Sequence, residues 1–159
     1  MNENTERRGG AAVGFLTELT SIEAASIIYL RLWSEGPQRQ AEVCSDLARF
    51  LGDAHGLKAM RVFEQLLELC GRHGRRPLMR HAVECRCIGA DEACFANFVA
   101  IAAEGDREDA LLIATLLVRP DVAPLVASLA SDFGLALKRM DMKSPRDMAP
   151  DGHAGVTIH

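Results

Sequence analysis

Two consecutive stretches of this chain are apolar on almost every side, and they constrain the fold more than any other feature. Residues 93–103 contain one polar side chain, Asn97, and residues 110–118 contain one, Thr115. Both stretches are rich in helix-forming Ala and Leu, and neither shows the period-two alternation of a strand. A helix that is apolar all round has to be covered by other helices. We therefore expect these two segments to form helices at the centre of the fold.

Glycines and prolines divide the remaining sequence into pieces of helical length. Thr20 with Glu23 three residues later predicts a capping box at a helix start. Gly36 then predicts a helix stop, and Pro37 suits the first position of the next helix. We expect seven helices, beginning near residues 20, 37, 57, 77, 91, 106 and 121. The predicted fold class is all-α, a multi-helix bundle or a stack of helical hairpins with almost no strand.

The 159 residues suit one domain. We assign residues 19–140 to the helical domain, residues 1–18 to a poorly patterned N-terminal segment, and residues 141–159 to a mobile or loosely docked tail. The five cysteines are odd in number and no region resembles a disulfide scaffold, which predicts reduced thiols and a cytoplasmic protein. The longest apolar run is about half of what a membrane span needs, so no membrane association is expected.

Charge is distributed unevenly along the chain. The net charge is −4, which disfavours a nucleic-acid partner. Residues 58–86 nevertheless carry seven Lys or Arg against three Glu. A basic cluster stands out within this region: Arg72, His73, Arg75, Arg76 and Arg80. Cations at the start of the helix expected near residue 77 oppose its dipole, so helix stability does not explain them.

Two interpretations of the basic cluster remain open. Backbone N–H groups at a helix start, together with forked guanidinium groups, would suit a phosphate or carboxylate, which predicts an anion site. Alternatively, the cluster pairs with acidic groups of the protein itself. Candidates are Glu64, Glu68 and the acidic loop of residues 104–109, within the chain or across a dimer. We favour pairing over a small-molecule anion.

Four residues could form a zinc site: His81, Cys85, Cys87 and Cys94. His81 and Cys85 are four residues apart, on one face of the expected helix, and a Cys₃His set suits tetrahedral zinc. However, Cys85 and Cys87 diverge on a continuous helix, and free cysteines are commonly buried for packing alone. We predict no cofactor, with zinc as the alternative. Redox sensing by Cys85 and Cys87, with Arg80 and Arg86 favouring thiolate, is a further alternative that we rank below a structural role.

The sequence contains no established enzyme motif. Gly-x-Gly-x-x-Gly, a Walker loop, Gly-x-Ser-x-Gly and the paired Glu-x-x-His of di-iron bundles are all missing from it. We therefore propose no catalytic residues. The expected function is a non-catalytic interaction or regulatory protein that binds a protein partner or itself as a homo-oligomer. The alternative is a ligand-binding protein that uses the Cys/His set or the basic cluster.

Three segments carry a resemblance to a known group of proteins. They are residues 74–83 (GRRPLMRHAV), 89–98 (GADEACFANF) and 115–120 (TLLVRP). In these segments the chain resembles small all-helical proteins of α-proteobacteria that have no assigned role. The resemblance covers the central part of the chain and implies a bacterial protein. It implies no activity, cofactor or partner.

Overall fold

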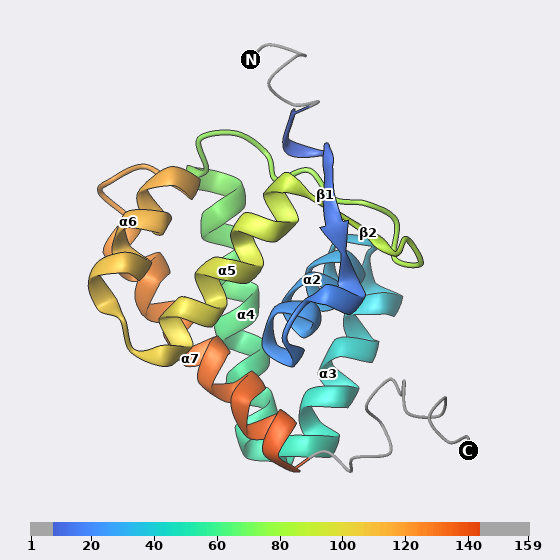
Figure 1. Ribbon diagram of the computed structural model, residues 1–159. Coiled ribbons are helices and arrows are strands. Elements are labelled where there is room, and N and C mark those ends of the chain that lie inside the picture. The colour runs from blue at the N-terminus through green and yellow to red at the C-terminus, as the bar shows by residue number, and fades with distance from the viewer. Residues whose placement is uncertain (1–7, 144–159) are drawn as a thin grey trace, which may run out of the picture.

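The computed structural model describes residues 8–143 and gathers six α-helices of 11 residues or more around a main hydrophobic core, with a smaller buried cluster beside it (Figure 1). The helices are α2 (Ser21–Ser34), α3 (Pro37–Leu51), α4 (Asp53–His73), α5 (Ala90–Glu104), α6 (Arg107–Leu117) and α7 (Ala123–Lys143). The predicted all-α class is confirmed, with six such helices in place of seven. Residues 1–7 and 144–159, which include most of the expected tail, lie outside the described residues.

Helix starts follow the local signals in the sequence. At α2 the Thr20 hydroxyl accepts from the Glu23 backbone N–H at 3.3 Å and donates to the Glu23 carboxylate at 2.8 Å. Gly36, with φ of 113°, separates α2 from α3, whose first residue is Pro37. The predicted capping box and proline start are therefore confirmed. Helix α4 begins at Asp53, earlier than the expected start near residue 57.

Helix α7, rather than α6, occupies the centre with α5. Helix α7 packs against α2, α3, α4, α5 and α6. Within the core, the rings of Phe63 on α4 and Phe133 on α7 stack with centroids 4.4 Å apart. Helix α5 packs against α2, α6 and α7, which fits its apolar surface. The expected central place of residues 93–103 is therefore confirmed.

The expectation that the second apolar stretch would be central is wrong. Helix α6 lies at one edge of the molecule and packs mainly against α5 and α7 (Figure 1). It buries Ala110, Ala114 and Leu117 on its inner side. On its outer side Leu112 and Leu116 are 65% and 68% exposed. An 11-residue helix with two neighbours cannot cover all of its apolar surface.

The helix expected to begin near residue 77 does not form. Residues 75–86 follow an irregular path, and the strand β2 (Cys87–Gly89) comes directly after them. This strand pairs antiparallel with β1 (Ala12–Phe15), which a short 3₁₀ helix, η1 (Leu16–Glu18), follows. The physical reason is that side chains from α2 and α5 bind the backbone groups that a helix would use, as described below. No helix within residues 8–143 has the length and apolar content to cross a membrane.

Candidate functional site

A fully buried ion pair lies beneath the irregular segment, which we call the 74–86 loop. The Arg31 guanidinium of α2 meets the Glu92 carboxylate of α5, with Nε–Oε2 at 2.6 Å and Nη2–Oε1 at 2.9 Å. Both side chains are 0% exposed. The motifs and spacings in the sequence do not reveal this pair. The available signal was an arginine enclosed by apolar residues in the last turn of α2.

Arg31 and Glu92 also form hydrogen bonds with backbone groups on either side of Cys85. Arg31 donates from Nη1 to the Cys85 carbonyl at 2.7 Å and from Nη2 to the Cys87 carbonyl at 2.8 Å. Glu92 accepts from the backbone N–H groups of His81 at 3.2 Å and Gly89 at 2.9 Å. Burial alone would raise the pKa of Glu92, but the hydrogen bonds from Arg31 and Gly89 lower it overall. The pair therefore stays charged and fixes the loop.

A second ion pair holds the start of the same loop. Arg76 makes a two-pronged contact with Asp91, through Nη1–Oδ2 at 2.6 Å and through Nη2–Oδ1. The Asp91 carboxylate also accepts from the Met79 backbone N–H at 2.8 Å. Consecutive carboxylates at the start of α5, Asp91 and Glu92, thus anchor both halves of the loop. This use of backbone and side-chain groups explains why a helix is absent there.

The basic cluster is spread over several partners. Arg72 lies 3.6 Å from Glu68, one helical turn away, which is one of the pairings expected for the cluster. Three other members of the cluster also have partners. Arg75 Nε donates to the Thr115 carbonyl at 2.6 Å, and Arg80 Nη1 donates to the Leu78 carbonyl at 3.1 Å. His73 Nδ1 accepts from Arg119 Nη2 at 2.9 Å.

Part of the basic cluster lines one surface groove. This groove has a volume of about 530 Å³, and Arg75, Arg76 and Arg80 contribute to it. Glu64 and Glu68 line the same groove, so its charge is mixed. A concentrated positive field, which an anion site would use, is therefore weakened by carboxylates of α4.

The acidic loop of residues 104–109 lies at the opposite end of α6 from the basic cluster. That loop leads into the first turn of α6. At the other end, Gly74 bridges to Val118, and the Arg75 backbone N–H donates to the Leu117 carbonyl at 3.0 Å. An 11-residue helix is about 16 Å long. The two loops therefore do not meet within one chain.

The four candidate zinc ligands do not gather around one point. His81 Nδ1 lies 3.6 Å from Cys85 Sγ, brought there by a turn in which the Cys85 N–H donates to the Ala82 carbonyl. Cys94 lies on α5 against the hydrophobic core, in a hollow shared with Asp91. Among residues 8–143, no group of three or more His, Cys, Asp or Glu side chains is placed to hold a metal ion.

The His81 ring bridges three parts of the chain. Its Nε2 lies 2.7 Å from the Gly10 carbonyl and its Nδ1 lies 3.2 Å from the Cys87 carbonyl. Carbonyl oxygens only accept hydrogen bonds, so the ring satisfies both contacts when both nitrogens carry protons. The hydrogen bond to Gly10 raises the pKa of His81, and the contact with Cys85 adds to this. The arrangement favours an imidazolium cation beside the Cys85 sulfur.

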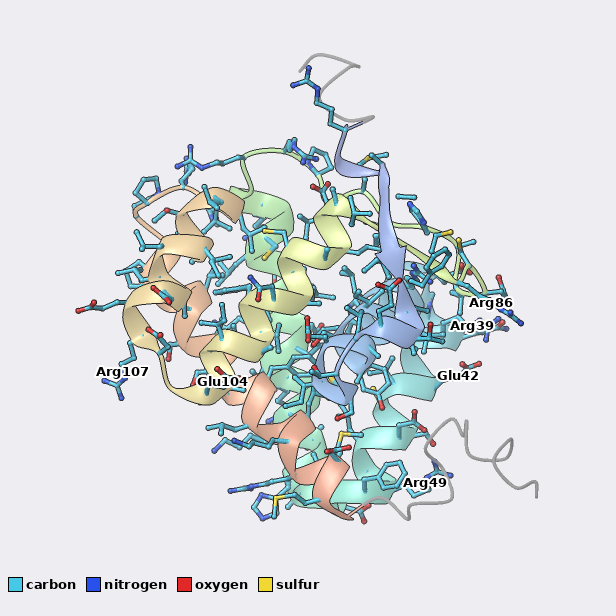
Figure 2. The ribbon with its side chains drawn as sticks, viewed as in Figure 1. Arg39, Glu42, Arg49, Arg86, Glu104 and Arg107 are labelled. Atoms are coloured by element: carbon cyan, nitrogen blue, oxygen red, sulfur yellow. The ribbon has the colours of Figure 1, made fainter. Side chains whose placement is uncertain are left out.

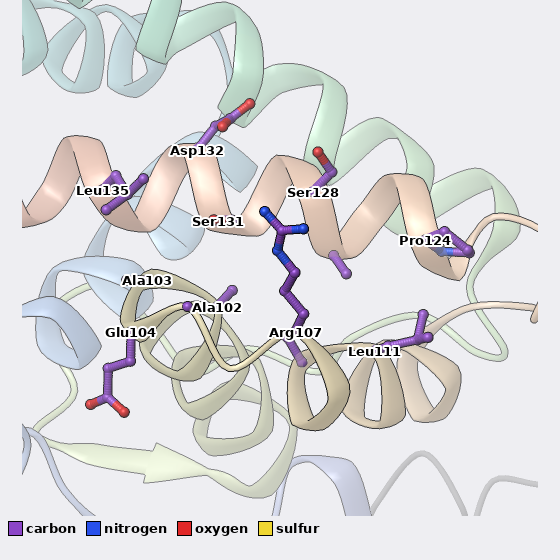
Figure 3. Close-up of a pocket in the computed structure, with 13 residues that line it drawn as sticks. Ala102, Ala103, Glu104, Arg107, Leu111, Pro124, Ser128, Ser131, Asp132 and Leu135 are labelled. Atoms are coloured by element: carbon purple, nitrogen blue, oxygen red, sulfur yellow. The ribbon is translucent and has the colours of Figure 1, made fainter.

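A separate groove of about 640 Å³ runs between the end of α5, α6 and α7. Figure 3 shows the Arg107 side chain extending from α6 across this groove toward the part of α7 that carries Ser128 and Ser131, while Glu104 points away from α7. Figure 2 places Glu104 and Arg107 on one side of the molecule and Arg86, from the 74–86 loop, on the other. The groove and the loop are therefore distinct surfaces.

Comparisons of the chain with protein-family models, with curated proteins and with solved structures found no match.

Proposed function

We propose that this protein is a non-catalytic interaction protein that pairs with a second copy of itself through the outer side of α6. One observation carries the proposal. The exposed side of α6 has leucines at its middle and in its last turn, acidic groups at its N-terminal end and basic groups beyond its C-terminal end. Such a surface is complementary to itself when two copies meet in antiparallel orientation.

The apolar part of this surface lies on one helical stripe. Leu112 and Leu116 are four residues apart and therefore adjacent on the helix surface. Both are mostly exposed, as noted above. Large exposed apolar side chains that adjoin one another mark interaction surfaces more often than isolated ones do. Leu111 and Leu135, also exposed, line the neighbouring groove and extend the patch toward α7.

The charges at the two ends of α6 are opposite. At its start Asp106, Glu108 and Asp109 outnumber the single cation Arg107, and Asp106 caps the helix. Arg119 and Arg75 lie at its far end, where the Arg119 N–H donates to the His73 carbonyl. A two-fold axis across the middle of α6 would bring each acidic end onto the basic end of the other copy. The intersubunit pairing expected from the sequence would then be formed.

The proposed dimer interface includes part of α7, because the exposed side of α6 alone is too small. A stable dimer buries about 800 Å² on each partner, which is more than one side of a three-turn helix offers. The groove beside α6 adds Leu111 and Leu135 on one flank. A hollow of about 510 Å³ adjoins Leu116 on the other flank and is lined by Arg75 and Arg76. Together these features supply a continuous surface wider than α6 alone.

The direct test is the mass of the purified protein in solution by analytical ultracentrifugation. We expect a concentration-dependent dimer for the natural sequence. The double variant Leu112→Glu/Leu116→Glu should be monomeric, since four carboxylates would then face one another in the dimer. Leu57→Glu is the matched control, because Leu57 on α4 is 47% exposed and lies outside the proposed surface. A natural protein that is monomeric at high concentration would refute the proposal.

Charge exchange tests the antiparallel orientation. Glu108→Arg removes the acidic excess at the start of α6, and Arg119→Glu reduces the basic charge at its far end, so each variant alone should dimerise about 2- to 30-fold more weakly. Mixing the two variants restores opposite charges at both ends and should produce a heterodimer that native mass spectrometry resolves. A mixture that contains only monomers and weak homodimers would exclude this orientation.

A further inference from the structure

We infer that Cys85 is a reactive thiol site at which the thiolate attacks small peroxides, with His81 as the proton donor. The site lies on the 74–86 loop, on a different surface from α6, and so does not depend on self-association. It is a modification site that goes beyond the proposed interaction role.

The geometry around the sulfur supports thiolate formation. Cys85 Sγ lies 3.6 Å from His81 Nδ1. The His81 ring faces carbonyl oxygens through both nitrogens, and these contacts favour the protonated ring. A cation within this distance stabilises a thiolate, which is the nucleophilic form of cysteine. The sulfur therefore has a positioned acid beside it.

Hydrogen bonds from the protein interior fix the backbone on both sides of Cys85. Arg31 holds the Cys85 and Cys87 carbonyls, and the Gly10 carbonyl holds the outer nitrogen of His81. The Cys–His contact is thus supported by a buried ion pair rather than by exposed contacts alone. A pair held in this way is preorganised for reaction.

The sulfur is accessible to small reagents. Cys85 is partly exposed, and its neighbours Glu84 and Arg86 are exposed on either side. The ion pair of the buried Arg31 and Glu92 lies next to His81 and Cys85, and the Cys87 side chain is a further neighbour of the sulfur. The Cys87 backbone N–H lowers the pKa of the Cys85 thiol, and the hydrogen bond from His81 lowers it further.

The other cysteines provide a contrast within the same molecule. Burial raises the pKa of the Cys44, Cys70 and Cys94 thiols, for Cys70 to about 12. Cys44 is partly exposed on α3 and lacks an adjacent histidine donor among the contacts of the described residues. Cys44 is therefore a suitable internal reference, because reagents can reach its thiol but no neighbouring histidine activates it.

The reaction with hydrogen peroxide balances as a two-electron transfer. The Cys85 thiolate attacks one peroxide oxygen, the S–O bond forms and the O–O bond breaks. The leaving hydroxide takes the proton from His81 Nδ1 and departs as water, while the other oxygen stays on sulfur as sulfenic acid. Sulfur is oxidised by two electrons and peroxide is reduced. No other reactant is required.

The first experiment measures alkylation of each cysteine by iodoacetamide in the folded protein, by peptide mass spectrometry across a range of pH. At about pH 7 we expect Cys85 to react at least tenfold faster than Cys44, because an ordinary thiol is only a few per cent thiolate there. In His81→Gln the pH profile of Cys85 should move to higher pH, with circular dichroism as the check of folding. Equal rates for Cys85 and Cys44 in the natural protein would overturn the inference.

The second experiment tests the peroxide reaction with hydrogen peroxide and dimedone, which captures sulfenic acid. Cys87→Ser is used because it removes the nearest thiol that could condense with the product. We expect a dimedone adduct on Cys85, and oxidation restricted to other residues would exclude this chemistry. The same rates should be found in the Leu112→Glu/Leu116→Glu variant, so failure of the dimer proposal and failure of this one are distinguishable.

Discussion

At the scale of single residues, removing one charge of the Arg31–Glu92 pair should lower the free energy of unfolding more than removing both charges. Arg31→Met leaves Glu92 buried without a counter-charge, which costs about 3–5 kcal/mol of the free energy of unfolding. Arg31→Met/Glu92→Gln removes both charges and should be less destabilised than the single variant. Recovery should be incomplete, because the Cys85 and Cys87 carbonyls still lose their donor. Urea unfolding of the three proteins measures these differences.

An exposed pair on α3 gives the control for this prediction. Arg39 and Glu42 are 3.1 Å apart, with both side chains largely in solvent. Arg39→Met should change the free energy of unfolding by less than about 1 kcal/mol. If Arg31→Met were as mild as Arg39→Met, the buried pair would not hold the 74–86 loop in the way described.

His81 gives the protein a pH-dependent contribution to stability. The hydrogen bond to Gly10 raises its folded-state pKa, so the protonated ring is bound more tightly in the folded state. The stabilisation is complete below the ordinary value of about 6.5 and is lost as pH rises through the higher folded value. In a Cys85→Ala background, which removes the coupled thiol, urea unfolding should show the effect of His81→Gln shrinking from about pH 5.5 to 8.5. A constant difference across this range would contradict the assignment.

At the scale of elements, the contact between α5 and α7 depends on the absence of a side chain at Gly134. A Cβ built there lies 2.7 Å from the Ala103 Cβ and 2.8 Å from the Val99 carbonyl oxygen. Gly134→Ala should therefore destabilise the protein by about 1–3 kcal/mol, although alanine is the better helix former. Gly71→Ala on α4 meets nothing within 4 Å and should stabilise by about 0.5–1 kcal/mol. Thermal unfolding that gave both variants the same sign would contradict this account.

The elements also show which parts of the fold could be predicted from sequence. The starts of α2, α3 and α6 depend on contacts within one turn, at Thr20, Pro37 and Asp106, and each was predicted. The path of the 74–86 loop depends on a contact between distant parts of the sequence, because Arg31 and Glu92 are 61 positions apart. Helical spacing therefore suggested a helix after Pro77, because nothing local indicates those distant partners.

In the candidate site, too, contacts between residues close in sequence could be predicted, whereas contacts between distant residues could not. The spacing of His81 and Cys85 predicted that the two side chains approach each other on one face of a helix. They do approach, but a turn and two backbone carbonyls that contact the His81 ring hold them there. The pairing of Arg72 with Glu68 is also local and was among those considered. The partner of Arg76 is Asp91, 15 residues away, and only the folded chain identifies it.

At the scale of the whole molecule, the placement of α6 turns two charged segments into the ends of one surface. The sequence indicated that the basic cluster could pair with the acidic loop within one chain or across a dimer. The Gly74–Val118 bridge fixes it at the far end of α6 instead. Within the chain, Arg119 at the basic end lies 3.6 Å from Asp121. In the proposed dimer the acidic end of one copy would also face the basic end of the other.

This arrangement predicts a pH-dependent dimer. Asp106 raises the pKa of Asp109 by like-charge repulsion, with Glu108 adding to it, so the monomer retains a proton at this end over a range where an ordinary carboxylate is charged. Arginines of a second copy would lower that pKa, so dimer formation releases protons and affinity should rise as pH increases from about 4 to 6. Analytical ultracentrifugation across this range measures the dissociation constant. Glu108→Gln/Asp109→Asn should flatten the dependence, whereas an equally steep profile in that variant would assign it to other groups.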